Sequence, residues 1–259
     1  MLCRLIIRSA QFLSYTDIEE IRLIRYNLLM GSLETYLYAV DTAGITEDDE
    51  LYKKALAQVS ESRRKKTLKI RDISGRRCSL AAELLTRHAI TDLGVPWPGG
   101  LETEDGGRPY LKGTAGIHIS ISHSGSMVIC SVSERETGCD IEQIKEGRSG
   151  RKIAERFFTE AEQEFAGDDT LKFYRIWTLK ESFLKVTGLG LALPLCDFSI
   201  EVSDREGGEA DISVIQHVDA NSYIFREFQD FPGYCCSVCT AGSDICKDVR
   251  RVEFRSLIW

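Results

Sequence analysis

The chain has 259 residues, of which 43% are hydrophobic and only 5 are proline, so it is long enough for one large domain or two smaller ones with their own cores. Its net charge of −7 disfavours general binding to nucleic acids. No apolar run approaches the roughly 18 residues that span a bilayer. The first residues carry Arg4 and Arg8 inside a short apolar stretch, an order that a signal peptide does not have. We therefore expect a cytoplasmic protein that does not associate with membranes.

Nine cysteines are scattered along the chain, several of them in apolar alternation where a small buried thiol would fit. In the absence of an export signal, we expect these cysteines to be reduced. Only Cys236 and Cys239 have the spacing of zinc ligands, and no second pair of Cys or His stands near them. A zinc site is therefore disfavoured.

The first half of the chain predicts a strand, two helices and two further strands. Their expected ranges are Thr35–Val40, Ser60–Arg71, Arg76–Leu93, Ile117–Ser122 and Met127–Ser133. The second half predicts a short strand, three helices and four strands. These ranges are Cys139–Gln143, Lys152–Phe157, Thr159–Phe165, Leu171–Val186, Phe198–Val202, Ile212–Gln216, Tyr223–Phe228 and Tyr234–Thr240.

Because strand, helices and then several strands recur in the same order, we expect an α+β fold of two similar α/β lobes. We expect a pseudo-twofold relation between the lobes, with the active site in the cleft between them. The predicted division places an N-terminal lobe at residues 33–137 and a C-terminal lobe at 138–259. Residues 1–32 precede the first strand and match no element of the second half, so we expect them to be an N-terminal extension.

A strongly basic stretch stands out in this acidic chain. Between Arg63 and Arg77 lie eight basic residues and one acidic residue, Asp72. A solvated helix face would explain the stretch, and a binding site for a small polyanion would explain it equally well.

Two acidic residues alternate on the predicted strand that contains Gly138-Cys139-Asp140-Ile141-Glu142. Side chains on a strand alternate between faces, so Asp140 and Glu142 share one face, about 7 Å apart. Two such carboxylates suit Mg2+, which takes few protein carboxylates and completes its octahedron with phosphate and water. An ordinary strand with a wet, acidic face has the same pattern.

The predicted helix around residue 180 places Trp177, Glu181 and Lys185 on one stripe. This pattern provides a third carboxylate and a cation for a phosphate group. The alternative is a helix-stabilising Glu–Lys pair beside a packed Trp, which contributes about 0.3 kcal/mol.

The segment from Ile117 to Gly125 predicts a buried strand face of three isoleucines, with His123 and Ser124 at the strand end. A Ser/His hydrolase is one interpretation, but the segment lacks the G-x-S-x-G motif that would support it. The alternative is that His123 and Ser124 form a turn that donates hydrogen bonds to phosphate oxygens, which requires fewer groups than a hydrolase does.

Taken together, three motifs closely resemble those of the 4′-phosphopantetheinyl transferases, in particular the long, two-lobed type that activates peptide synthetases such as surfactin synthetase. The motifs are I-S-H-S-G at Ile121–Gly125, G-x-D-I-E at Gly138–Glu142 and W-x-x-K-E-x-x-x-K at Trp177–Lys185. Their identity, order and separation all agree, and the similarity runs from about Leu33 to the C-terminal strands. The resemblance implies transfer of 4′-phosphopantetheine from coenzyme A to a serine of an acyl or peptidyl carrier protein, by a monomer.

The resemblance also implies roles for individual residues. Asp140, Glu142 and Glu181 match the family's Mg2+ site, which Mn2+ could also occupy, and Glu181 matches the carboxylate that activates the incoming serine. Lys185 matches the lysine that contacts the coenzyme A diphosphate and protonates the leaving group.

The coenzyme A nucleotide has its own matches. Ser122 and His123 match the turn that holds its phosphates, and Arg63 and Lys66 match the basic pair at the 3′-phosphate. Two further matches are Arg108, which stands where the family has the lysine of G-K-P, and Ser79, which stands where the family has a small hydroxyl residue.

Glu162 falls at a position that the family uses near the metal, but Thr159-x-x-Glu162 is also a helix capping box. The chain departs from the family's usual residues at Ser120 (usually Asn), Met127 (often Trp) and Cys139 (usually Ile). None of these departures removes a metal ligand or the catalytic lysine.

Three other functions remain open. A Mg2+-dependent phosphohydrolase would use the same acids with water as nucleophile, and a non-catalytic coenzyme A-binding module would keep only the binding residues. Nucleic-acid binding through the basic stretch is disfavoured by the lack of interleaved aromatic residues.

Overall fold

The computed structural model describes residues 34–104, 107–114, 116–145, 150–204 and 210–259. Its largest sheet has four strands in the order β11-β1-β5-β4. These strands are β11 (Asp244–Val252), β1 (Glu34–Asp41), β5 (Met127–Ser133) and β4 (His118–Ser124). Strand β1 runs parallel to β11 and antiparallel to β5, and β5 pairs with β4 as a hairpin.

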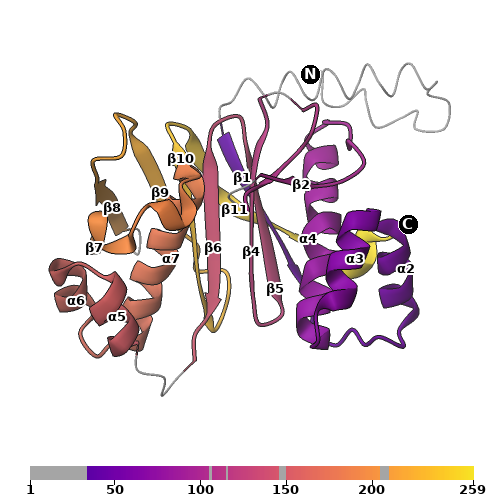
Figure 1. Cartoon of the computed structure of the whole chain (residues 1–259), viewed down its shortest axis with the longest axis horizontal. Helices are drawn as coiled ribbons and strands as arrows, with labels where there is room; N and C mark the ends of the chain where they lie inside the picture. Colours follow the sequence, from indigo (N-terminus) through magenta and orange to yellow (C-terminus); the bar gives the residue numbers. More distant parts are fainter. Residues whose placement is uncertain (1–33, 105–106, 115, 146–149, 205–209) are drawn as a thin grey trace, which may run out of the picture.

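A second sheet has the order β6-β10-β9, and all its pairs are antiparallel. Its strands are β6 (Thr137–Gln143), β10 (Tyr234–Ala241) and β9 (Tyr223–Glu227). Two hairpins lie outside these sheets, β2–β3 (Glu102–Thr103 and Pro109–Tyr110) and β7–β8 (Ser199–Asp204 and Ala210–Ile215). Strands β4 and β6 lie side by side where the two sheets meet (Figure 1).

Helices flank the strands on two sides (Figure 1). On one side are α2 (Glu50–Gln58), α3 (Glu61–Lys69) and α4 (Ile73–Asp92), and on the other α5 (Arg151–Phe157), α6 (Glu160–Ala166) and α7 (Thr170–Thr187). Short 3-10 turns follow at η3 (Gly190–Ala192), η4 (Leu195–Asp197) and η5 (Phe254–Leu257). The two longest helices each cover a sheet, since α4 packs against β5 and α7 against β6 and β10.

Local sequence signals explain where the helices next to the site begin and end. Ser60 caps α3 by accepting from the backbone N–H of Arg63, and Asp169 caps α7 in the same way. Helix α7 ends at Gly188, whose φ of 70° places it in the left-handed region that glycine adopts without steric cost. These caps fix the ends of the elements that carry the basic residues and Glu181.

Gly138 lets β6 approach α7 unusually closely. A Cβ at this position would lie 2.0 Å from the carbonyl oxygen of Ser182 and 2.6 Å from the backbone nitrogen of Val186. No larger residue fits without moving the helix. The glycine of the G-x-D-I-E motif therefore brings Asp140 and the residues of α7 together.

Buried apolar side chains form three clusters. One lies between α4 and the four-stranded sheet, and a second surrounds α7. The third, which includes Leu37, Ile129, Ile141 and Val238, takes residues from β1, β5, β6 and β10 and so joins the two sheets. Cys236 belongs to this third cluster and Cys239 to the second, because residues three apart on a strand point to opposite faces.

The predicted mixture of strands and helices is confirmed, with two notable additions. Helix α2 and strand β11 were not predicted, and β11 places the last residues of the chain in the sheet of the first half. The division of the chain at 137/138 stays a prediction, and the expected extension at 1–32 lies outside the described residues. Among the described residues, no helix has the length and apolar character needed to cross a bilayer. The cysteines that the structure describes are free thiols.

Candidate active site

Two serines of β4 hold the two carboxylates of β6. The Ser122 hydroxyl donates to Oδ1 of Asp140 at 2.7 Å, and the Ser124 hydroxyl donates to Oε2 of Glu142 at 2.8 Å. Asp140 is only 4% exposed, whereas Glu142 is half-buried. The predicted acidic face of the strand is thus packed against a neighbouring strand and is not freely solvated.

Lys185 of α7 reaches across to the same strand. Its ammonium group donates to Oδ1 of Asp140 at 2.8 Å and to the carbonyl oxygen of Cys139 at 2.9 Å. Burial acts to lower the pKa of Lys185, but the charge and hydrogen bond of Asp140, together with the charges of Cys139 and Glu181, outweigh it, and the pKa is raised. The lysine is therefore held as a cation beside the acidic residues.

Glu181, one helical turn before Lys185, belongs to the same electrostatic group. Burial raises the pKa of Glu181, and the negative charges of Asp140 and Glu142 raise it further. Burial also raises the pKa of Glu142, although its hydrogen bond from Ser124 opposes the shift. The structure thus brings the three predicted acids and the predicted lysine into mutual electrostatic range.

The donor set suits a hard divalent cation. Oδ2 of Asp140 is buried and has no hydrogen-bond partner, which is costly for a carboxylate oxygen unless a cation completes its surroundings. Like-charged carboxylates that meet at one site are also stabilised by a cation. Among the residues that the structure describes, however, no three His, Cys, Asp or Glu side chains are already arranged as a metal cage. The chemistry of these residues therefore fits Mg2+. Lys185 donates to Oδ1 of Asp140, so Oδ2 is the oxygen of this carboxylate that is available to the ion.

A cationic group lies beside the acids, around His123 at the end of β4. Desolvation by the surrounding chain lowers the pKa of His123, and the nearby charges of Lys185, Arg63 and Lys66 lower it further. Arg63 is anchored by Nε, 3.5 Å from Oε2 of Glu83, while Lys66 is exposed. The predicted phosphate-binding residues of α3 and the β4 turn therefore do lie close together.

Ser79 and Arg108 each have hydrogen-bond partners outside this cationic group. Ser79 is 5% exposed and shares a 2.7 Å hydrogen bond with the hydroxyl of Thr67, between α3 and α4. Arg108 donates to Glu136, which also accepts from Nδ1 of His118 at 3.1 Å. A coenzyme A contact by either Ser79 or Arg108 therefore stays a prediction.

Glu162 lies in a fully buried ion pair. Nζ of Lys180 is 2.6 and 2.7 Å from its two carboxylate oxygens, and both side chains are 0% exposed. Glu162 also accepts from the backbone N–H of Thr159, which completes the predicted capping box, and from that of Ile200. These contacts show that Glu162 and the lysine of the W-x-x-K-E motif hold α6, α7 and β7 together.

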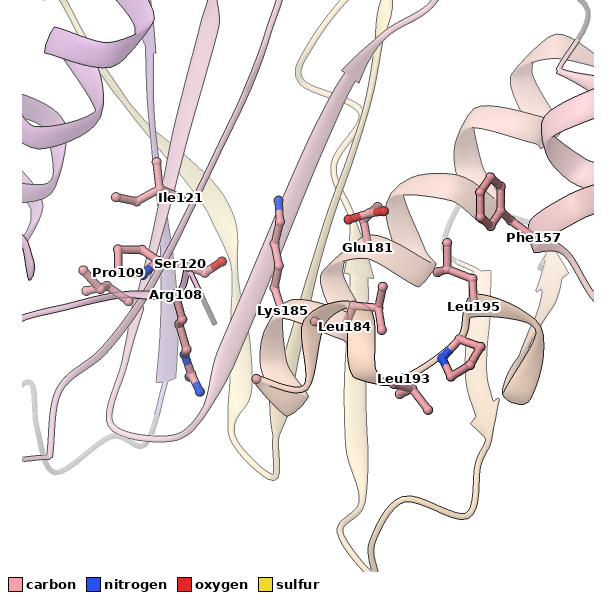
Figure 2. A pocket seen from close by; sticks show the side chains of 15 residues that line it. Arg108, Pro109, Ser120, Ile121, Phe157, Glu181, Leu184, Lys185, Leu193 and Leu195 are labelled. Atoms are coloured by element: carbon pink, nitrogen blue, oxygen red, sulfur yellow. The ribbon is translucent and has the colours of Figure 1, made fainter. Parts of the chain in front are cut away.

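A cavity of about 470 Å³ opens next to Glu181 and Lys185. One wall comes from residues 107–109 and 119–121, and the other from Phe157, α7 and the segment that follows it. Figure 2 shows Arg108 and Ile121 on one side of this space and Glu181 and Leu195 on the other. The lining is mostly apolar, with a charged group on one wall (Arg108) and two on the other (Glu181 and Lys185), so the cavity suits a ligand with an extended, largely uncharged part.

The aromatic residues near this cavity divide between packing and lining. Phe158 is 3% exposed and stacks on Phe173, so it belongs to the core. Phe157 lines the cavity and contacts the ring of Trp177 edge-on. Sequence reasoning placed Ser124 at the strand end but did not predict its hydrogen bond to Glu142. It missed Glu83 and Glu136, which lie in none of the motifs.

Comparisons with known proteins agree with this arrangement. Residues 136–239, which carry β6, α7 and β10, match the family model of the 4′-phosphopantetheinyl transferase superfamily. A 4′-phosphopantetheinyl transferase of Bacillus subtilis is 29% identical over 210 residues, which are 78% of this chain and 91% of that relative.

Two further relatives extend the match. The 4′-phosphopantetheinyl transferase Sfp of Bacillus subtilis strain 168 is 33% identical over 60% of this chain and 69% of its own length. The 4′-phosphopantetheinyl transferase psf-1 of Bacillus pumilus is 31% identical over 74% of this chain and 85% of its own length. The chain therefore belongs to the 4′-phosphopantetheinyl transferase superfamily, and it is an enzyme that transfers the phosphopantetheine group to carrier proteins.

Proposed function

We propose that Asp140, Glu142 and Glu181 hold one Mg2+, and that Lys185 beside them completes the catalytic group. The observation that carries this proposal is that Lys185 bonds to Oδ1 of Asp140, that the buried Oδ2 of Asp140 has no hydrogen-bond partner, and that the charges of Glu142 and Glu181 act on the same group. Mn2+, which also prefers oxygen ligands, would occupy the same position. When bound, the metal neutralises negative charge that develops on phosphate oxygens.

Coenzyme A is the donor in this proposal. Arg63 and Lys66 supply positive charge for the nucleotide phosphates, and His123, whose pKa is lowered, donates a hydrogen bond to them as a neutral imidazole. Lys185, whose charge acts on His123, extends this group toward the diphosphate. Ser122 can donate to phosphate only if its hydroxyl leaves Asp140, so we assign it the contact that forms on ligand binding. The pantetheine arm then extends into the largely apolar cavity.

The reaction joins the carrier's serine oxygen to the phosphorus that bears pantetheine. As that P–O bond forms, the bond to the bridging oxygen breaks, and adenosine 3′,5′-bisphosphate leaves. Glu181 accepts the serine proton as the general base, a role that its place beside Asp140 and Lys185 supports. Lys185 stabilises the charge that develops on the leaving oxygen and protonates it.

We further propose that the molecule consists of two α/β lobes related by a pseudo-twofold axis, with the site in the cleft between them. The strand orders β1-β5-β4 and β6-β10-β9 support this. In each, an early strand (β1 or β6) pairs with the second strand of a later antiparallel pair (β4–β5 or β9–β10). The free thiols fit the reducing cytoplasm.

Mass spectrometry of an apo-peptidyl carrier domain and an apo-acyl carrier protein, each incubated with enzyme, coenzyme A and Mg2+, tests the proposal. We expect each reactive carrier to gain the mass of one phosphopantetheine, and we expect a chelator to stop the gain. Asp140→Asn and Glu181→Gln should lower turnover by about a hundredfold or more while the far-ultraviolet spectrum stays unchanged. Near-normal transfer by both variants would overturn the assigned site, and phosphate release without a carrier would indicate a hydrolase instead.

A further inference from the structure

The edge of β6 that faces β4 is held by serine side chains instead of a regular backbone ladder. The backbone N–H of Cys139 donates to the hydroxyl of Ser120 at 3.1 Å, and that of Gln143 donates to the hydroxyl of Ser124 at 3.0 Å. These bonds fix the register of β6 relative to β4. They bracket the two acidic residues of the strand, at positions 140 and 142.

Ser124 differs from Ser120 because its hydroxyl does two things at once. It accepts from Gln143 and donates to Oε2 of Glu142 at 2.8 Å. A hydroxyl has one proton, so the direction of the first bond fixes the direction of the second. The backbone of β6 thereby orients the serine, and the serine orients the carboxylate.

Glu142 has no comparable support within the described part of the chain. Ser124 is the one side chain there that donates a hydrogen bond to it. Across the sheet Glu142 stands opposite Cys235, a buried thiol that is a weak donor. Without Ser124, the half-buried carboxylate would be free to change rotamer.

Two other features hold Ser124 itself in place. It is the last residue of β4 and pairs with Met127 across the turn. The turn residue Gly125 has a φ of 58°, and a Cβ there would lie 2.6 Å from the hydroxyl of Tyr234 and 2.9 Å from Oε1 of Gln143. The turn is therefore packed tightly against β6 and β10, which makes the position of the serine rigid.

We propose that Ser124 is a positioning residue that fixes Glu142 for binding of the divalent cation. This inference rests on the metal site proposed above. Groups that orient metal ligands through a second hydrogen bond typically change metal affinity 10- to 100-fold when they are removed. The hydroxyl of Ser124 has the geometry of such a group, and we assign it no contact with coenzyme A.

Titration of the full-length protein with Mn2+, followed by electron paramagnetic resonance of the free ion, tests this role. We expect Ser124→Ala to raise the Kd for Mn2+ about 10-fold, and Ser124→Thr, which keeps the hydroxyl, to restore most of the affinity. The matched control is Ser213→Ala, which removes the 3.1 Å bond from Ser213 to Glu201 on the distant β7–β8 hairpin and should leave the Kd unchanged. Coenzyme A affinity without metal, measured by calorimetry, should be the same in all these variants.

Glu142→Gln distinguishes failure of this inference from failure of the metal site. If Glu142→Gln binds Mn2+ as the wild type does, the proposed metal site is wrong, and the role of Ser124 fails with it. If Glu142→Gln weakens binding but Ser124→Ala does not, the positioning role alone is overturned. A loss of coenzyme A affinity in Ser124→Ala would also overturn it, because the serine would then act on the nucleotide. Should Ser124→Ala not fold, Ser124→Cys, a weaker donor of similar size, takes its place, and wild-type Mn2+ affinity would refute the proposal.

Discussion

Replacing Lys180 by methionine should destabilise the enzyme more than it impairs the chemistry. Lys180 and Lys185 both belong to the W-x-x-K-E-x-x-x-K motif, but only Lys185 reaches Asp140. Nζ of Lys180 instead contacts both oxygens of Glu162 and the carbonyl oxygen of Phe198 at 2.8 Å. The structure therefore assigns the two lysines of one motif to different tasks.

The expected magnitude follows from the burial of this pair. Lys180→Met would leave the Glu162 carboxylate inside the protein with two backbone donors but without its cation. Removing one partner of a buried ion pair costs about 3–5 kcal/mol. In a chain of this size, about 1 kcal/mol shifts the thermal midpoint by roughly 2–4 °C, so the midpoint should fall by roughly 6–20 °C.

Circular dichroism melts and transfer assays well below the midpoint would measure the two effects separately. Lys65→Met is the matched control, because Lys65 pairs with Glu61 on an exposed helix face, where ion pairs contribute little. The double variant Lys180→Met/Glu162→Gln removes both charges and should recover part of the lost stability. An unchanged midpoint for Lys180→Met, or a large loss of turnover in the folded variant, would refute the assignment.

Three other outcomes follow from the structure. Lys185→Met should abolish most transfer at low temperature. It should also raise Mn2+ affinity in the absence of coenzyme A, because no lysine then pairs with Asp140. Unchanged or weaker Mn2+ binding by calorimetry would count against this. Gly138→Ala should lower the thermal midpoint severely, since its Cβ would overlap the backbone of α7; a normal melt would disprove the close approach. Hydrogen bonding from His118 lowers the pKa of Glu136 to about 2. The ionised Glu136 therefore stabilises the folded state fully above pH 4.5, its ordinary pKa, and this contribution is lost as the pH falls from 4.5 to 2. Urea midpoints of the wild type and Glu136→Gln should therefore converge across that window, and a constant difference would contradict the ion pair.

Periodicity predicted most of the elements around the site because their apolar patterns are strong. The β5 strand was predicted at Met127–Ser133 with its observed bounds, and α4 and α7 were predicted within a few residues. Helix α2 was missed because only Tyr52 and Ala55 of its nine residues are buried. Strand β11 was missed because it lies at a sheet edge and carries charges along much of its length.

Within the site, residue types predicted proximity better than they predicted partners. The strand and helix motifs indicated that Asp140, Glu181 and Lys185 would meet, and they do. Spacing along the sequence carries no information on long-range contacts, so the partner of Arg108, Glu136, could not be predicted. The capping box at Glu162 could be predicted from the sequence. Its ion pair with the buried Lys180 could not, because that contact depends on the packing of α6 against α7.

Anomalous scattering from crystals grown with coenzyme A and Mn2+ would locate the metal ion. We expect one strong peak within bonding distance of carboxylate oxygens of Asp140, Glu142 and Glu181, with Lys185 turned from Asp140 toward the diphosphate. A bound coenzyme A whose metal peak lies away from these three side chains would contradict this expectation.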